Sequence, residues 1–158
     1  MKISKRLLTM PLSSVPNKFV ITILVLALIG FVDATYLTIE HYQNVIPPCA
    51  VGGCETVLTS VYSEVAGIPV ALAGAIYYLF ILIGALAYLE GRHERLLRYV
   101  LIATTFGLLA SLYFLFLQAF ILHAYCLYCL GSLTTSTVLF ILAITVFSKY
   151  QHTDTLSV

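Results

Sequence analysis

Four cysteines in two close pairs are the residues of this chain whose types and spacing point most clearly to chemistry. Cys49 and Cys54 enclose the sequence Ala-Val-Gly-Gly, and Cys126 and Cys129 form a Cys-x-x-Cys motif. A thiolate attacks a disulfide through a mixed-disulfide intermediate, so two adjacent pairs can pass electrons from one to the other. The two glycines give the first loop the backbone freedom that such a relay needs. The pattern therefore predicts thiol–disulfide exchange.

Structural disulfides and a zinc site are the alternatives. A bond between Cys49 and Cys54 closes a loop of about six residues and removes only about 2 kcal/mol of denatured-state entropy, so it is a weak brace. A Cys-x-x-Cys that opens an apolar helix, with no basic residue beside it, is not typical of a zinc site, and we expect no metal. A non-enzymatic membrane protein with structural disulfides remains an open alternative.

The second pair lies where the last apolar segment begins. If that helix starts near Cys126, the thiol lies in its first turn, where free N–H groups and the helix dipole favour the thiolate. Cys129 then lies on the same face, about 4.5 Å deeper along the axis. Cys126 is placed to meet another protein sulfur, and Cys129 to meet a compound dissolved in the bilayer. The adjoining Tyr125, Tyr128 and His123 are candidates for the lining of a pocket or for interfacial anchors.

The composition is that of a membrane protein. The 158 residues are 61% hydrophobic and 9% charged, with a mean hydropathy of +1.01. A net charge of +1 leaves no basic face for nucleic acid. Four segments can cross the roughly 30 Å hydrocarbon layer. They run from about 19 to 40, 68 to 89, 96 to 123 and 126 to 147.

The basic residues predict the orientation. They precede the first segment, separate the second from the third, and follow the fourth: Lys2, Lys5, Arg6, Lys18, Arg92, Arg95, Arg98 and Lys149. By the positive-inside rule both termini are cytoplasmic, and the loop at about 41–66 faces outward from the cell (inner) membrane. Reading the first segment as a cleaved signal peptide would leave that loop outside as well.

We therefore expect one all-α domain over residues 1–158. It is a polytopic four-transmembrane-helix bundle with an extracytoplasmic cysteine loop, and residues 55–63 of that loop form a short amphipathic helix. Asp33 is an acid well inside the first span, which makes it a candidate proton donor or a hydrogen-bonding group between helices. The sequence does not predict an oligomeric state.

Taken in order, these motifs resemble those of the vitamin K epoxide reductase family in its bacterial or archaeal branch. The resemblance covers about residues 19–147. It rests on the two cysteine pairs and on three further motifs: Val57-Leu58-x-Ser60, Gly67-Ile68-Pro69 and Gly74. It implies a quinone-dependent protein-disulfide oxidoreductase that takes electrons from a thioredoxin-like (DsbA-like) protein on the outer face. The electron acceptor is a membrane quinone of ubiquinone, menaquinone or vitamin K type.

The resemblance also implies roles for the cysteines. Cys49 exchanges with the partner, Cys54 forms a mixed disulfide with Cys126, and Cys129 passes the electrons to the quinone. The chain stops at Val158 without a fused thioredoxin-like domain, so we expect a stand-alone member with a separate partner. The direction of electron flow depends on redox potentials, which the sequence does not give.

The resemblance further suggests where the quinone binds. Ser60 corresponds to a loop serine that helps to hold the cap over the site. Vertebrate epoxide-reducing members carry Asn and Tyr where this chain has Val70 and Leu133. We therefore expect quinone reduction, with a vitamin K epoxide or quinone reductase as the alternative. The expected quinone-binding residues are Ser60, Tyr125, Tyr128, Val70 and Leu133.

Overall fold

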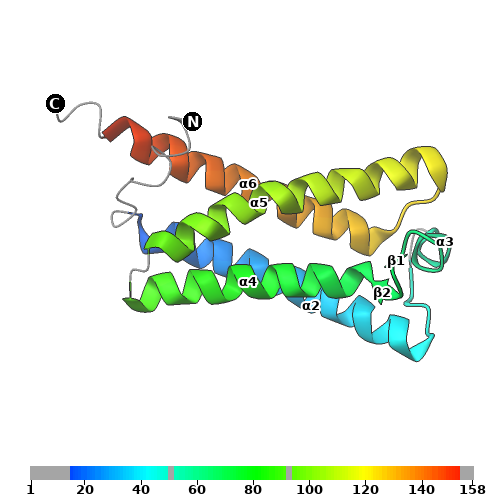
Figure 1. Ribbon diagram of the computed structural model, residues 1–158. Coiled ribbons are helices and arrows are strands. Elements are labelled where there is room, and N and C mark those ends of the chain that lie inside the picture. Colours follow the sequence, from blue (N-terminus) through cyan, green and yellow to red (C-terminus); the bar gives the residue numbers. More distant parts are fainter. Residues whose placement is uncertain (1–14, 50–51, 92–93, 154–158) are drawn as a thin grey trace.

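Four long helices lie side by side and form the body of the protein (Figure 1). The structure is a computed structural model that describes residues 15–49, 52–91 and 94–153. Its long helices are α2 (Asn17–Gln43), α4 (Val70–Gly91), α5 (Glu94–Phe116) and α6 (Leu127–Thr153). The last turn of α5 continues as a π-helical segment, η2 (Leu117–Ile121). The connection from α2 to α4 contains α3 (Cys54–Leu58) and the strands β1 (Glu64–Val65) and β2 (Ile68–Pro69).

The prediction of an all-α membrane bundle is confirmed. Among the described residues, four helices are long and apolar enough to cross a membrane, with a mean hydropathy of 2.0 to 2.3 in their most apolar windows. Helices suit this solvent because every backbone group inside the bilayer is paired within its own segment. The spans begin and end within a few residues of the expected bounds: Asn17–Gln43, Val70–Gly91, Arg95–Ile121 and Leu127–Ser148.

Glycines allow the helices to approach each other closely. A Cβ atom on Gly30 of α2 would overlap the ring of Tyr78 on α4, and one on Gly84 would overlap Val100 of α5. Small residues serve this purpose in membranes, where lipid provides no hydrophobic drive for helix association. The hydroxyl of Tyr78 also hydrogen-bonds to the hydroxyl of Ser132 on α6 at 2.9 Å. These contacts fix the position of α4 against its neighbours.

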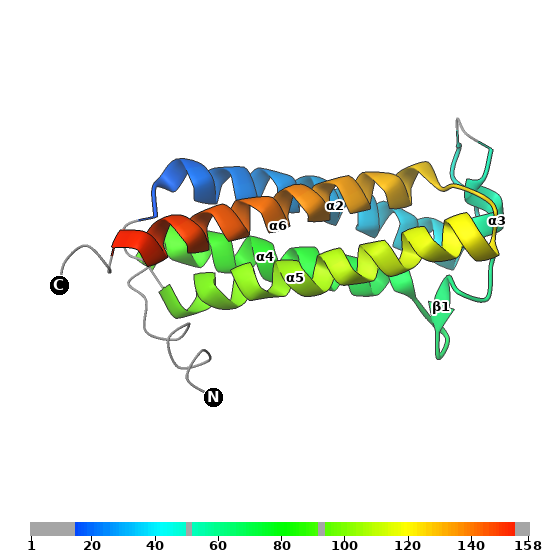
Figure 2. The same ribbon diagram turned by 90° about the horizontal axis from the view of Figure 1, so that it is seen from above.

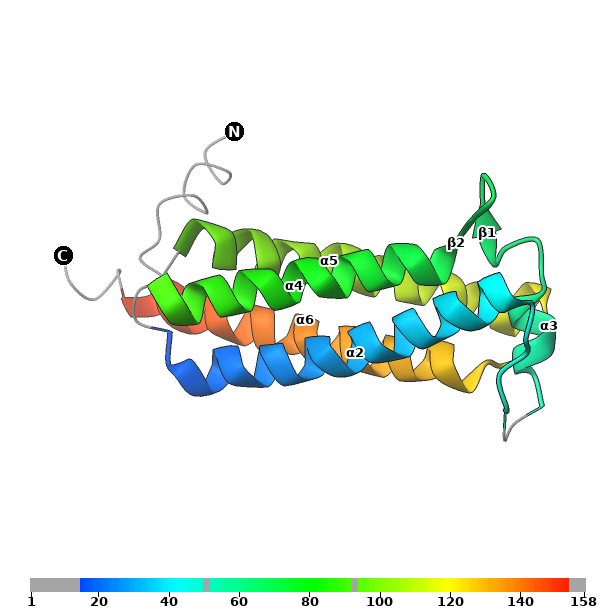
Figure 3. The same cartoon turned by 90° about the horizontal axis from the view of Figure 1, so that it is seen from below.

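The two ends of the bundle differ in what they carry. The loop with α3 and the β1–β2 hairpin lies at one end, beside the connection between α5 and α6 (Figures 1, 2 and 3). The start of α2 and the start of α5 lie at the opposite end. Lys18, Arg95 and Arg98 are therefore at the far end of the bundle from all four cysteines.

The loop between α2 and α4 differs from the expectation in detail. Helix α3 ends at Leu58 instead of near residue 63. The Ser60 hydroxyl donates to the Val57 carbonyl at 2.8 Å, and this local bond competes with continuation of the helix. The β1–β2 hairpin that follows was not predicted. Its two-residue turn, Ala66-Gly67, has φ values of 54° and 77°, as a type I′ turn requires.

Candidate active site

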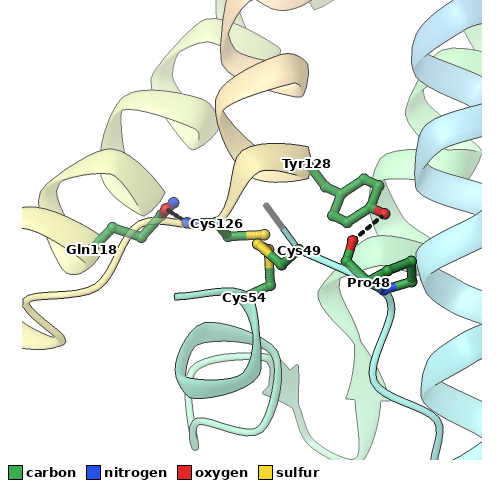
Figure 4. The surroundings of a disulfide bond; sticks show 6 residues. All are labelled: Pro48, Cys49, Cys54, Gln118, Cys126 and Tyr128. Carbon is green, nitrogen blue, oxygen red and sulfur yellow. Dashed lines mark hydrogen bonds between the residues drawn. A yellow bond between two sulfur atoms is a disulfide. The ribbon is translucent and has the colours of Figure 1, made fainter. Parts of the chain in front are cut away.

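Three of the four cysteines meet beneath the loop. Cys49 and Cys54 form a disulfide with a Cα–Cα distance of 5.9 Å, whereas Cys126 and Cys129 are free thiols. Figure 4 shows the Cys126 side chain pointing toward that disulfide. Cys54 and Cys126 are fully buried and share one apolar cluster with Val57, and Cys49 and Cys129 pack against this cluster. The fold thus places the helix thiol against the loop disulfide.

Gly53 permits this close approach. It precedes α3, and a Cβ atom at Gly53 would lie 2.5 Å from the carbonyl oxygen and 2.7 Å from the nitrogen of Tyr125. The backbone of the loop therefore contacts the backbone just before Cys126. Gly52 has a different requirement, because its φ of 75° lies in the left-handed region that favours glycine.

Tyr128 ties the loop to α6 from the other side. Its hydroxyl donates to the carbonyl of Pro48 at 3.0 Å (Figure 4). Its ring also lies 5.8 Å from the ring of Tyr36 on α2, measured between centroids. Tyr128 therefore holds the residue before Cys49 at the helix that carries the second thiol pair.

Cys126 caps helix α6 instead of lying in its first turn. The helix begins at Leu127, and the Cys126 carbonyl accepts the N–H of Leu130 at 3.0 Å. A hydrogen bond with the Cys129 side chain lowers the pKa of Cys126 to about 7, against the opposing effect of burial. The backbone N–H groups of Cys129 and Tyr128 lower this pKa further. The sulfur thus occupies the place of an N-cap oxygen.

A cavity of about 1000 Å³ opens between the helices below this cluster. Its lining comes from α2, the loop, α4, α5 and α6. Cys129 is part of the lining, together with Asp33 of α2. The helix thiol pair therefore lies between the loop disulfide on one side and the cavity on the other.

The comparison with protein families identifies the group to which the chain belongs. The Vitamin K epoxide reductase family matches residues 21–144, a range that contains all four cysteines. The chain belongs to the vitamin K epoxide reductase family. Membership implies an oxidoreductase that oxidises thiols and reduces a quinone. A search of curated proteins found no match to the chain.

The cavity of this family member contains some of the expected quinone-binding residues and not others. Ser60, Val70 and Tyr128 line it, whereas Tyr125 and Leu133 are not among its lining residues. Tyr125 precedes α6 and its side chain is 46% exposed. The cavity face of α6 runs through three residues spaced three and four apart, Cys129, Ser132 and Ser136. Leu133 lies to one side of that face.

Two further polar groups face the cavity, and sequence analysis did not identify them. The Tyr77 hydroxyl and one carboxylate oxygen of Glu40 are buried and have no hydrogen-bond partner among the described residues. The ring of Tyr77 packs on Gly107, where a Cβ atom would overlap it. A tyrosine in the middle of an apolar span was the available signal, because a buried hydroxyl requires a partner.

The described residues contain no group of three or more His, Cys, Asp or Glu side chains arranged to hold a metal ion.

Proposed function

We propose that this protein oxidises the dithiol of a thioredoxin-like protein and passes the electrons through its two cysteine pairs to a membrane quinone. The net result is disulfide-bond formation in the partner. One observation carries the proposal: the Cys126 thiol lies between the Cys49–Cys54 disulfide and Cys129, and Cys129 lines a cavity in the membrane-spanning part. Each step of electron transfer between the cysteines then takes place between neighbouring sulfur atoms.

The first half of the cycle consists of thiol–disulfide exchange. A partner thiolate attacks Cys49, the partly exposed sulfur of the loop disulfide, and the partner leaves oxidised while Cys49 and Cys54 become a dithiol. The Cys54 thiolate attacks Cys126 of a Cys126–Cys129 disulfide and releases the Cys129 thiolate. Cys49 then attacks Cys54 and releases Cys126. This sequence ends with a loop disulfide and a helix dithiol, the arrangement seen in the structure.

The second half returns the helix pair to its disulfide. Oxidation of the Cys126–Cys129 dithiol releases two electrons and two protons, which is what reduction of a quinone to a hydroquinone consumes. Cys129 is the thiol at the cavity and delivers the electrons. Asp33 also lines the cavity and is the candidate to relay a proton.

The cavity fits a quinone head group. Its volume of about 1000 Å³ is at the upper end of typical ligand pockets. Most of the lining is apolar, and the Tyr77 hydroxyl provides a buried donor without a protein partner. A quinone carbonyl is an acceptor that would satisfy this donor. Val70 lines the cavity where vertebrate members carry Asn and offers no such group, which supports quinone over epoxide as the substrate.

The orientation proposed from the basic residues has the cysteine end on the extracytoplasmic side of the membrane. A partner in the oxidising compartment would then reach Cys49, and Lys18, Arg95 and Arg98 would lie at the cytoplasmic end of the bundle.

The test is anaerobic mixing of the purified protein with a reduced thioredoxin-like protein and a quinone, with hydroquinone formation followed by absorbance. Wild type should oxidise one partner dithiol for each quinone reduced. Cys129→Ala should stop quinone reduction, because the Cys126–Cys129 disulfide that Cys54 attacks can no longer form. Quinone reduction that survives in Cys129→Ala, or a wild-type protein that never oxidises the dithiol, would contradict the proposal.

A further inference from the structure

Gln118 is a buried amide whose two ends have different partners. Its side chain is 2% exposed and lies at the end of α5 within the π-helical segment η2. The Oε1 atom accepts the backbone N–H of Cys126 at 2.8 Å (Figure 4). The Nε2 group donates to the carbonyl of Phe114 at 3.3 Å. Gln118 thus joins the third span directly to the backbone of a redox cysteine.

The local backbone explains how Gln118 reaches this position. The N–H of Leu122 bonds to the carbonyl of Leu117 at 2.9 Å, the five-residue spacing of a π-turn. The N–H of Ala124 bonds to the Gln118 carbonyl at 3.1 Å. Both the main chain and the side chain of Gln118 therefore hold the short connection that leads to α6. Single π-turns within helices are frequent at functional sites.

Cys126 requires a fixed backbone for its chemistry. Its sulfur must bond alternately to Cys129 and to Cys54. The side chain can rotate between these two partners, but a displaced backbone would move the sulfur out of reach of both. Its sulfur also accepts from the N–H groups of Tyr128 and Cys129, an arrangement that depends on the cap geometry of Cys126. The hydrogen bond that the Cys126 N–H donates to Gln118 Oε1 fixes the one backbone donor of Cys126.

We propose that Gln118 is a positioning residue that holds Cys126 at the start of α6, so that its sulfur can exchange between Cys129 and Cys54. The inference rests on the proposed function, because it assigns Gln118 a role in the same relay. A buried glutamine that serves only packing would contribute to stability without changing the reactivity of Cys126. The test therefore measures that reactivity directly and without quinone.

The experiment uses a Cys49→Ala, Cys129→Ala background, in which Cys54 and Cys126 are the remaining thiols. The rate of their disulfide formation is measured with a thiol oxidant such as diamide over a range of pH. Gln118→Leu removes both side-chain hydrogen bonds at similar volume. We expect the rate of disulfide formation to fall by about tenfold, because the buried N–H of Cys126 loses its acceptor and the cysteine is no longer held in place. We also expect the pH midpoint of the reaction to rise.

The matched control is Thr104→Val in the same background. Thr104 is fully buried on α5 and donates to the Leu101 carbonyl at 2.6 Å, away from the cysteines. Loss of the Thr104 hydroxyl should leave the rate of Cys54–Cys126 disulfide formation and its pH midpoint unchanged. Should Gln118→Leu fail to fold, as judged by its helical circular dichroism, Gln118→Met supplies an unbranched side chain of similar length for the same measurement.

The outcomes separate the two proposals. An unchanged rate and an unchanged pH midpoint in the Gln118 variants overturn the positioning role while leaving the relay intact. Absence of a Cys54–Cys126 bond even with Gln118 present contradicts the relay itself. Gln118 is supported as the residue that positions Cys126 if two results are found together. Disulfide formation is slower with a raised pH midpoint in the Gln118 variants, and it is unchanged in the Thr104 variant.

Discussion

At the scale of single residues, Cys126 is the point on which the site depends. Its N–H, its carbonyl and its sulfur each have a separate partner: Gln118, Leu130 and the Cys129 thiol. The loop disulfide lies on its other side. A residue held at three points can exchange sulfur partners without movement of the helix, which is what a two-step relay needs.

Tyr77 is the residue whose substitution tests substrate recognition. Its hydroxyl is the buried cavity donor without a described partner, so Tyr77→Phe should remove one hydrogen bond to the quinone. Loss of about 1–1.4 kcal/mol should raise the KM for quinone by about fivefold to tenfold. Steady-state kinetics with varied quinone checks this.

The control for Tyr77→Phe is formation of the Cys54–Cys126 bond, which involves no quinone and should not change. A KM equal to that of wild type would show that the Tyr77 hydroxyl does not contact the quinone.

Gly53 tests the contact between the loop and α6. In Gly53→Ala the new Cβ would collide with the Tyr125 backbone, which cannot move aside as a flexible side chain would. The loop must therefore shift, and we expect Cys54–Cys126 exchange to slow by about tenfold, the change that a cost of 1.4 kcal/mol produces. Trapping the mixed disulfide over time measures the rate. Gly131→Ala on α6 is the control, because its Cβ would meet nothing within 4 Å. An equal rate in the two variants would contradict the steric argument.

At the scale of elements, the start of α6 determines the reactivity of its thiol. The first N–H groups of a helix have no partner within the helix, and here the Cys126 sulfur accepts two of them. Cys129 follows within the same turn, on the cavity side. One helix terminus thus provides both an activated thiol and its partner.

This arrangement predicts a pH dependence. Because the pKa of Cys126 is lowered to about 7, by the Cys129 side chain first and then by backbone N–H groups, its thiolate should dominate above pH 7. Steps in which the Cys126 thiolate is the attacking group should slow as the pH falls through that value. The ultraviolet absorbance of the thiolate, measured as wild type minus Cys126→Ala, gives the midpoint of the titration. A midpoint near the usual thiol value of about 8.5 would contradict the capping interpretation.

At the scale of the whole molecule, the site lies at one end of an apolar bundle, and Lys18, Arg95 and Arg98 lie at the other. The four spans form the scaffold, and the loop that carries the disulfide covers one end. Because the disulfide joins residues only five positions apart, it constrains the loop and not the bundle. The disulfide can therefore be reduced and re-formed while the helix bundle stays folded.

Removal of the loop disulfide tests this separation of roles. The double variant Cys49→Ala, Cys54→Ala should lose partner oxidation completely and lose at most about 2 kcal/mol of unfolding free energy. Circular dichroism during unfolding in micelles measures the stability. Collapse of the four-helix bundle in this variant would favour the non-enzymatic protein braced by its disulfides.

The orientation is tested with single reporter cysteines in a background where the four native cysteines are replaced by Ala. Thr59→Cys at the loop end should react with a membrane-impermeant maleimide in intact cells. Asn17→Cys at the start of α2 should react only after lysis. Both positions are exposed in the structure, so access depends on the side of the membrane. The reverse pattern would place the active site in the cytoplasm.

Much of the fold and part of the site could be predicted from the sequence because the signals are local. A span is recognised from its own composition, and a Cys-x-x-Cys at a helix start from its own spacing. The hairpin Ala66-Gly67 and the early end of α3 were not predicted. They depend on turn geometry and on the Ser60 hydroxyl, which are weak signals in a polar loop.

By itself, the sequence determined the four spans, the two thiol pairs and the uneven distribution of basic residues. Only the tertiary structure decided that Cys126 faces the loop disulfide, that Gln118 reaches the Cys126 amide, and that Tyr77 and not Leu133 faces the cavity. The reason is that helices such as α4 and α6 are apolar on all sides, so no hydrophobic stripe specifies which face turns inward. Close contacts at small residues set that rotation, and they form only when the helices pack together.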